Sequence, residues 1–323
     1  MKEITLGIDI GGTNTVFGAV DLDGKSYFEG RIPTPEYKSF PEFVRKIYDV
    51  FDHLVQNLNF PHKFLGIGIG APNGNFYSGE VNLAPNLPWK GRLEVAKEFS
   101  AVFGLPAWVT NDAKAAAIGE MMFGAAKGMK NFMVITLGTG LGSGFVVNGE
   151  LMYGHDGFAG EFGHVIVHPD GRMCGCGRRG CLETYASATG IKRTVYKLLA
   201  DNLEPSVLRT VSFDKLSADM ISKAAKAGDQ IAIEAFEYTG MILGSKLADA
   251  VAICSPEAIV LFGGLAKAGE LIINPVKKHM EESLLPIYRN KISILQSGIH
   301  GSNGAVLGAA ALAWKQLGYS VTS

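Results

Sequence analysis

The chain has 323 residues, of which 47% are hydrophobic and 19% are charged, and its formal net charge is −1. This length supports two domains with cores of their own, and the near-zero charge gives no electrostatic footprint for nucleic acid. No uncharged apolar run approaches the roughly 18 residues that a membrane-spanning helix needs, and the first residues lack the apolar segment of a signal peptide. We therefore expect a compact cytoplasmic protein with neither a nucleic acid nor a membrane as its partner.

The first predicted elements are two strands joined by a glycine turn. Residues 4–10 and 15–20 are apolar and β-branched, as in buried strands, and residues 11–14 read Gly-Gly-Thr-Asn. Because a strand follows the turn, this is neither a Rossmann nor a Walker loop, whose glycines precede a helix. Exposed backbone N–H groups and the Thr13 hydroxyl can still bind phosphate, with Asp9 orienting a metal-bound water. The alternative is an ordinary β-hairpin.

A helix, a strand and a loop follow. Residues 40–57 have apolar side chains at helical spacing, and residues 64–70 read as a buried strand that ends at Ala-Pro-Asn-Gly. In α/β folds, the loops at the carboxyl ends of strands carry the ligand-binding residues. The polar and aromatic loop 82–89, which contains Asn86, either contacts a sugar or simply packs, and residues 91–103 are predicted to be a helix.

Asn111 and Asp112 stand between a short strand, 106–110, and a helix predicted over 113–126. Asn and Asp are favoured helix caps, and a carboxylate is stabilised by the positive end of the helix dipole. A carboxylate at a strand end is also well placed to accept a proton from an attacking hydroxyl. We favour a catalytic role for Asp112, with simple capping as the alternative.

A second hairpin repeats the build of the first. Strands are predicted at 131–137 and 143–148, around the turn Gly138-Thr139-Gly140 and its neighbours. Two glycine-turn hairpins of one build, each beginning half of the chain, indicate duplicated halves that bind a nucleotide's phosphates from opposite sides.

Three of the four cysteines, Cys174, Cys176 and Cys181, fall within eight residues, and His164 lies ten residues upstream. Three thiolates and one imidazole form the tetrahedral Cys3His set that structural zinc prefers. A disulfide or free loop cysteines are the alternatives, and the odd number of thiols argues against a disulfide. Zinc there would fix the flanking carboxylates Glu161 and Glu183, which suit sugar hydroxyls.

The rest of the chain alternates helices with two strands. The strand 258–262 ends at Gly263-Gly264, where a flat group can lie on the backbone or the chain simply turns. Helices are predicted at 184–200, 214–227, 229–251, 265–271, 275–285 and 303–317, and the last strand at 292–295.

These motifs carry a resemblance. Glu-x-Gly-His followed by Cys-x-Cys-Gly-x-x-Gly-Cys-x-Glu resembles the signature of the ROK family, which comprises repressors, open reading frames and sugar kinases, and the paired hairpins resemble the actin and hexokinase superfold. The resemblance implies a two-domain, duplicated α/β fold of the actin/hexokinase-like (ribonuclease H-like) class. We expect a small domain of residues 1–111 plus 303–323, and a large domain of residues 112–302 that carries the zinc motif.

The resemblance also implies an activity, the ATP-dependent phosphorylation of a hexose at its 6-hydroxyl in carbohydrate metabolism. Glucose is favoured because the Glu-Phe-Gly-His and Asn-Leu-Pro-Trp spellings are similar to those of the family's bacterial glucokinases. N-acetylglucosamine, N-acetylmannosamine and fructose are alternatives, since 71–74 departs from the proline followed by glycine of many relatives.

The resemblance assigns roles by position. Asp112 would be the base that deprotonates the 6-hydroxyl. The implied sugar-binding residues are Asn86, Asn111, Asp112, Glu161, His164 and Glu183. The implied ATP-binding residues are Asp9, Gly11, Gly12, Thr13, Asn14, Gly138, Thr139, Gly140, Gly263 and Gly264. The implied ligands of structural Zn²⁺ are His164, Cys174, Cys176 and Cys181.

Magnesium is implied with ATP, because the transferred phosphoryl group needs its charge offset, and family members suggest a homodimer or homotetramer. The rival class is a sugar-responsive ROK repressor. Such repressors carry a DNA-binding helix-turn-helix domain before the first hairpin, where we expect none in this chain.

Overall fold

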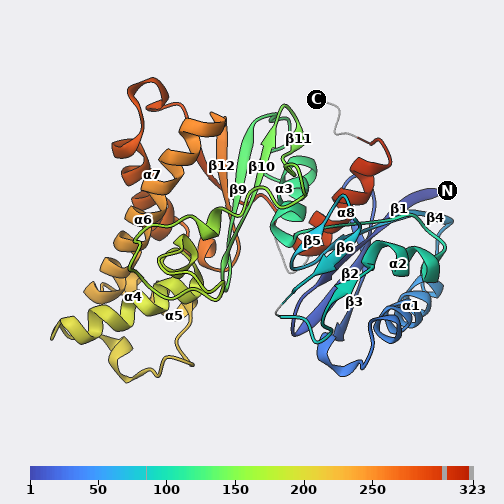
Figure 1. Cartoon of the computed structure of the whole chain (residues 1–323), viewed down its shortest axis with the longest axis horizontal. Helices are drawn as coiled ribbons and strands as arrows, with labels where there is room; N and C mark the ends of the chain where they lie inside the picture. Colours follow the sequence, from blue (N-terminus) through green and yellow to red (C-terminus); the bar gives the residue numbers. More distant parts are fainter. Residues whose placement is uncertain (85, 300–303, 320–323) are drawn as a thin grey trace. The chain divides into compact units, whose positions relative to one another are not determined.

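The computed structural model describes residues 1–84, 86–299 and 304–319, which form two compact units (Figure 1). The first unit comprises residues 1–129, 151–160 and 298–323, and the second comprises residues 130–150 and 161–297. The domain boundary near residue 112 stays a prediction. Residues 303 and 320–323 of the predicted C-terminal segment lie outside the described residues.

The first unit is built on a five-stranded sheet in the order β3-β2-β1-β4-β8. β1 pairs antiparallel with β2 and parallel with β4, which pairs parallel with β8. The carboxyl ends of three parallel strands therefore meet at one edge, where Asp9, Gly70 and Thr110 are in register. The strands are β1 Lys2–Ile10, β2 Asn14–Val20, β3 Ser26–Pro33, β4 His62–Gly70 and β8 Ala107–Thr110.

One face of this sheet is covered by α1 (Phe40–Gln56) and α2 (Val95–Phe103). Apolar residues of β1, such as Ile8, pack there with residues of both helices, such as Phe43 and Phe99, which are fully buried. The apolar spacing that predicted α1 thus forms the helix's buried face.

The opposite face carries α8 (Gly304–Gln316). Gly7 and Gly68 are paired on β1 and β4 beneath it. A Cβ on Gly7 would lie 2.1 Å from the Val306 carbonyl oxygen, and one on Gly68 would lie 1.8 Å from that of Ala309. Glycines at both positions therefore let the helix backbone rest directly on the sheet.

Helix α3 (Asp112–Phe123) packs against α8 in the same close manner. A Cβ on Gly119 of α3 would lie 2.8 Å from the Cα of Gly308 on α8. This crossing places the start of α3, with Asp112, at the carboxyl edge of the sheet.

The second unit repeats the sheet of the first, with strand order β11-β10-β9-β12-β13. β9 pairs antiparallel with β10 and parallel with β12, which pairs parallel with β13, as β1 pairs with β2 and β4 with β8. The predicted duplication of the halves is therefore confirmed. The strands are β9 Phe132–Leu137, β10 Leu141–Val147, β11 Glu150–Leu151, β12 Ala258–Phe262 and β13 Ser293–Gln296.

The helices of the second unit surround one large apolar core. The long α6 and α7 lie side by side (Figure 1), and a Cβ on Gly240 of α6 would lie 2.5 Å from the ring of Pro275. The helices are α4 Ala188–Asp201, α5 Ala218–Lys226, α6 Gln230–Cys254 and α7 Glu270–Ser283. Short 3-10 turns occur at Phe162–His164, Leu182–Thr184 and Leu265–Ala268.

Several predicted helices have other bounds. The helix predicted from residue 91 begins at Val95, because Arg92–Leu93 forms β7 with β6 (Glu80–Asn82) and β5 (Gly74–Asn75). The helix predicted at 265–271 is instead the 3-10 turn Leu265–Ala268. The helix predicted at 275–285 is α7, which begins at Glu270 and includes Pro275, and this proline packs on α6. None of the helices within 1–84, 86–299 and 304–319 is long and apolar enough to span a bilayer.

Candidate active site in two half-sites

Two carboxylates meet at the carboxyl edge of the first sheet. An ideal Cβ on Gly70 would lie 3.6 Å from Asp9 Oδ1 and 3.7 Å from the Cα of Asp112, so both residues border the same point. Asp9 ends β1 and Asp112 begins α3. The predicted base and the predicted phosphate-side aspartate are therefore neighbours.

Burial and mutual repulsion perturb these carboxylates. Burial first, and the charge of Asp112 second, raise the pKa of Asp9 to about 7. Desolvation by the surrounding protein also raises the pKa of Asp112, and a hydrogen bond from the Ala113 backbone lowers it in part. Asp112 is nevertheless exposed to solvent. A carboxylate that is accessible yet poorly solvated is a stronger base than an ordinary aspartate.

Asn111 caps α3. Its Oδ1 accepts a hydrogen bond from the Ala113 N–H at 2.9 Å, and Asp112 Oδ1 accepts from the same group at 2.8 Å. The capping interpretation is thus correct for Asn111. For Asp112 capping occupies one oxygen, which leaves the second for chemistry.

The first glycine turn lies against the loop that contains Asn86. A Cβ on Gly12 would lie 2.5 Å from the Asn86 carbonyl oxygen, so only glycine fits there. The side chains of Thr13, Asn14 and Asn86 are exposed. Trp89 of the same loop is buried and donates its indole N–H to the Tyr37 carbonyl at 3.0 Å, so this aromatic residue packs in the core.

Asn73 belongs to the Ala-Pro-Asn-Gly segment that departs from the pattern of many ROK relatives. It adopts a left-handed backbone with φ of 54°, which asparagine tolerates better than most residues. Its amide donates to the carbonyls of Asn82 and Leu83 at 3.2 and 3.0 Å. The departure therefore anchors the loop that leads to Asn86.

In the second unit the glycine turn meets a carboxylate. The Gly138 N–H donates to the Gly140 carbonyl at 3.0 Å, and a Cβ on Gly140 would lie 2.6 Å from Glu183 Oε2. Thr139, which stands between Gly138 and Gly140 in the sequence, is exposed. A predicted phosphate turn and a predicted sugar-binding carboxylate thus lie in contact.

The Gly263-Gly264 turn lies beside the same hairpin. Gly263 has φ of 101°, and a Cβ there would lie 2.9 Å from the Leu137 carbonyl oxygen, next to Gly138. Gly264 is exposed. The residues predicted to bind phosphate and adenosine in this half of the chain are therefore adjacent.

The predicted metal ligands come together. The ligand atoms of His164, Cys174, Cys176 and Cys181 all lie within 4.8 Å of one another. The Cys176 and Cys181 sulfurs are 3.6 Å apart, and Cys174 Sγ is 3.8 Å from His164 Nδ1. Ligands around tetrahedral zinc are separated by about 3.5 to 3.8 Å at its usual bond lengths, so the arrangement fits a tetrahedral ion.

The charge state of Cys176 also fits a metal ligand. Although burial acts in the opposite direction, hydrogen bonds from Arg178 and the neighbouring thiols lower the pKa of Cys176 to about 6. The thiolate is the form that binds metal, whereas burial raises the pKa of the Cys174 and Cys181 thiols. His164 turns Nδ1 toward the cysteines, which leaves Nε2 for a second partner.

Glu161 and Glu183 approach this cluster differently. Glu183 Oε1 accepts a hydrogen bond from the Cys174 thiol at 2.8 Å and lies 3.8 Å from His164 Nδ1. Glu161 is exposed, and the Phe162 N–H beside it donates to Ser143 Oγ at 3.4 Å. Glu183 therefore lies directly against the cluster, whereas Glu161 is positioned through the backbone beside it.

The chain matches the model of the ROK family over residues 5–316. The chain belongs to the ROK family. A glucokinase of Streptomyces coelicolor is 36% identical over 318 residues, which cover 96% of this chain and 97% of that protein. A ROK glucokinase of Streptomyces griseus, solved with glucose and AMPPNP, is 34% identical with a TM-score of 0.80, covering 97% of this chain and 99% of the other.

ROK regulators are similar to the chain as well. A structure described as a ROK family transcriptional regulator, a homologue of the E. coli MLC protein, has a TM-score of 0.87 at 28% identity. The match covers 98% of this chain and 79% of that one. The neighbours confirm the actin/hexokinase-like class of α/β fold, which kinases and regulators share.

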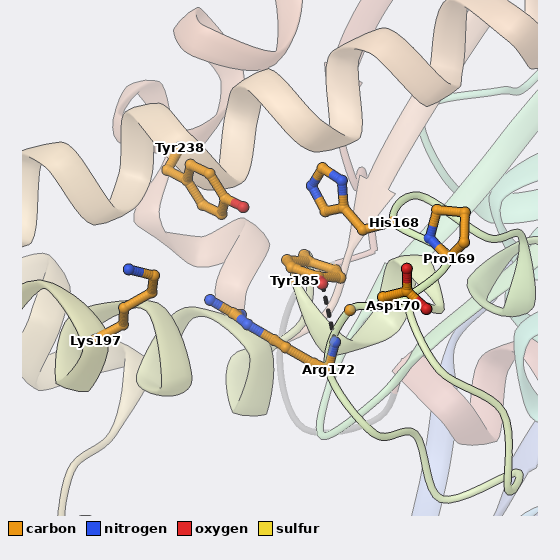
Figure 2. Close-up of a pocket in the computed structure, with 8 residues that line it drawn as sticks. His168, Pro169, Asp170, Arg172, Tyr185, Lys197 and Tyr238 are labelled. Atoms are coloured by element: carbon orange, nitrogen blue, oxygen red, sulfur yellow. Dashed lines mark hydrogen bonds between the residues drawn. The ribbon is translucent and has the colours of Figure 1, made fainter.

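Arg172, which sequence reasoning missed, fixes the ROK cysteine segment to the start of α4. Its guanidinium lies 4.4 Å from the centre of the Tyr185 ring and donates to the Thr184 and Gly190 carbonyls at 2.8 and 3.0 Å. Figure 2 shows it beneath that ring. Because Thr184 follows Glu183, this arginine secures the backbone that carries the carboxylate.

A cavity of about 510 Å³ opens beside Arg172 (Figure 2). None of the predicted sugar or nucleotide residues lines it. The lining residues are His168, Pro169, Asp170, Gly171, Arg172, Tyr185, Lys197 and Tyr238. The cavity therefore lies apart from the predicted sugar-binding and ATP-binding residues.

Proposed function

We propose that the protein is an ATP-dependent hexokinase that phosphorylates glucose at the 6-hydroxyl. The observation that carries the proposal is Asp112, an accessible carboxylate with a raised pKa at the carboxyl edge of the first sheet, in a chain of the ROK family. Relatives named glucokinase match nearly its full length.

In the proposed reaction Asp112 accepts the proton of the sugar's 6-hydroxyl. The oxygen attacks the γ-phosphorus of ATP, the bond from that phosphorus to the β–γ bridging oxygen breaks, and ADP leaves. Only the ionised carboxylate can accept the proton, so the rate falls as the pH drops through the pKa of Asp112. Its raised pKa moves this loss above the usual aspartate range.

The remaining predicted residues would bind the two substrates. Asn86, Asn111, Glu161, His164 and Glu183 would hydrogen-bond to the sugar hydroxyls. Gly11, Gly12, Thr13 and Asn14, with Gly138, Thr139 and Gly140, would hold phosphates through backbone N–H groups and hydroxyls. Gly263 and Gly264 would contact the adenosine.

The proposed zinc would be structural, since four protein ligands leave no open position. It would be held by His164, Cys174, Cys176 and Cys181, whose spacing fits a tetrahedral ion. Magnesium would accompany ATP and offset its phosphate charge. The half-buried Asp9 carboxylate fits the environment of such a cation, because a nearby positive charge would relieve its repulsion from Asp112.

A coupled assay of ADP release with glucose, mannose, fructose, N-acetylglucosamine and N-acetylmannosamine tests the proposal. We expect turnover with glucose to have the highest kcat/KM. A higher value with an N-acetylhexosamine or fructose would assign another substrate within the ROK kinases. Sugar binding without turnover of any hexose would instead favour a regulator. A homodimer or homotetramer in the cytoplasm is proposed with this function.

A further inference from the structure

Lys114 is a buried lysine that the proposed mechanism does not use. It lies on α3, two residues after Asp112, and is only 2% exposed. Lysine is almost never fully buried unless its ammonium group has partners. Its partners therefore indicate what this charge holds together.

Two of these partners lie in a distant part of the chain. The Lys114 ammonium donates to the Gly157 carbonyl at 2.7 Å and lies 5.8 Å from the centre of the Tyr153 ring. Both residues belong to Leu151–Gly160, which we call the strap. The strap is part of the first unit, although the chain on either side of it belongs to the second.

Residues that follow β4 also hold the strap. Asn75 donates its amide to the Asp156 carbonyl at 2.6 Å, and the Tyr77 hydroxyl donates to the Gly154 carbonyl at 3.0 Å. Phe76 stacks on Tyr153, with ring centres 4.3 Å apart and planes at 11°. The strap is therefore seated by backbone carbonyls and one aromatic stack, with Lys114 as its buried anchor.

The strap leads directly into Glu161, four residues after Gly157. We propose that Lys114 is a positioning residue for the sugar. By holding the strap on α3, it fixes the last residues of the chain before Glu161. This inference rests on the proposed function, in which Glu161 and Asp112 bind one hexose.

Substitution by methionine tests the inference, because Lys114→Met keeps the volume and removes the donor. We expect the Kd for glucose to rise at least about tenfold, or 1.4 kcal/mol, and amide hydrogen exchange in residues 153–160 to accelerate. Affinity for a non-hydrolysable ATP analogue should stay within about twofold. Lys114→Arg, which retains a donor, should recover much of the glucose affinity. The matched control is Lys46→Met on the exposed side of α1.

If Lys114→Met changes neither the glucose affinity nor the amide hydrogen exchange of the strap, the inference is overturned. Equal losses of glucose and nucleotide affinity would also overturn it, because they indicate general damage to the fold. If that variant does not fold, Tyr77→Phe removes one strap hydrogen bond from an exposed side chain. It should weaken glucose binding about two- to threefold, and an unchanged Kd would then overturn the inference. If the wild-type protein binds no hexose, the proposed function fails, whereas strap exchange still tests what Lys114 holds.

Discussion

The two glycine turns have the same topology but different supports. In the first unit a Cβ on Gly12 would meet the backbone of Asn86 at 2.5 Å, whereas in the second a Cβ on Gly140 would meet the tip of the Glu183 side chain at 2.6 Å. The first turn is thus packed against main chain, and the second against a carboxylate that a cysteine cluster also holds. The same hairpin therefore contacts main chain in one unit and a functional side chain in the other.

The predicted site residues of the two units accordingly differ in what holds them in position. Asp9 and Asp112 are placed by strand register and by the start of a helix, without a metal cluster nearby among the described residues. Glu183 lies in a single 3-10 turn that follows Cys181, one of the predicted metal ligands, so a bound metal would help to fix its position. We therefore expect a chelator that removes zinc to leave Asp9 and Asp112 in place and to disturb the position of Glu183.

The largest effect is expected for Asp112→Asn. Removing the base should lower kcat by about 10²- to 10⁴-fold, the usual contribution of a positioned general base, and should leave glucose affinity nearly intact. The coupled ADP assay and calorimetric titration with glucose measure the two quantities. Asp49→Asn, an exposed position on α1, is the control. A variant with wild-type turnover would contradict the assignment.

Loss of the metal should come next. Cys176→Ser should reduce bound zinc, measured by elemental analysis, and raise the KM for glucose at least about tenfold, because Glu183 and His164 lose their common support. Cys254→Ser is the matched control, since its Sγ lies outside the cluster and donates to the Ala250 carbonyl, as a serine can. Full activity after the zinc has left would show that the cluster does not position the carboxylates.

The two turns can be compared directly by alanine substitution. Gly12→Ala must displace backbone and should lower the free energy of unfolding by about 1 to 3 kcal/mol. Gly140→Ala displaces only the flexible end of Glu183, so it should cost less than about 1 kcal/mol while raising the KM for glucose. Chemical denaturation and steady-state kinetics measure both. Equal stability losses in the two variants would remove the distinction between the turns.

The smallest effect concerns the pKa of Asp9. Because part of its rise comes from the charge of Asp112, Asp112→Asn should bring the pKa of Asp9 below 7, as carbon-13 NMR titration can measure. Because the pKa of Asp9 is higher in the folded than in the unfolded chain, its protonated form stabilises the fold below about pH 4. This contribution is lost as the pH rises to about 7. In the variant this loss should therefore be smaller and should be complete at a lower pH. An unshifted Asp9 would mean that burial alone sets its pKa.

Local pattern was sufficient to predict much of this molecule. Strand-turn-strand patterning predicted both hairpins, and ligand spacing predicted that His164 and three cysteines converge. Apolar spacing at Phe40, Phe43 and Ile47 predicted α1. These features depend on residues close together in sequence, where periodicity and turn chemistry act directly.

Features that depend on distant parts of the chain could not be predicted in this way. Gly7 and Gly68 read as weak strand residues, and only the position of α8 shows that they admit a helix backbone. Lys114 falls within a predicted helix, and the local pattern does not show that the strap covers it. Trp89 belongs to the loop predicted either to contact a sugar or to pack, and it packs on Phe43 with ring centres 4.6 Å apart. Each depends on a tertiary partner that local sequence does not specify.

The most direct test is a crystal structure with glucose and a non-hydrolysable ATP analogue. We expect an Asp112 carboxylate oxygen within about 3 Å of the sugar's O6, the reach of a general base, with Glu161, Glu183 and His164 on the ring hydroxyls of the same molecule. A glucose bound by the second unit's residues while its O6 lies beyond hydrogen-bonding reach of Asp112 would contradict it.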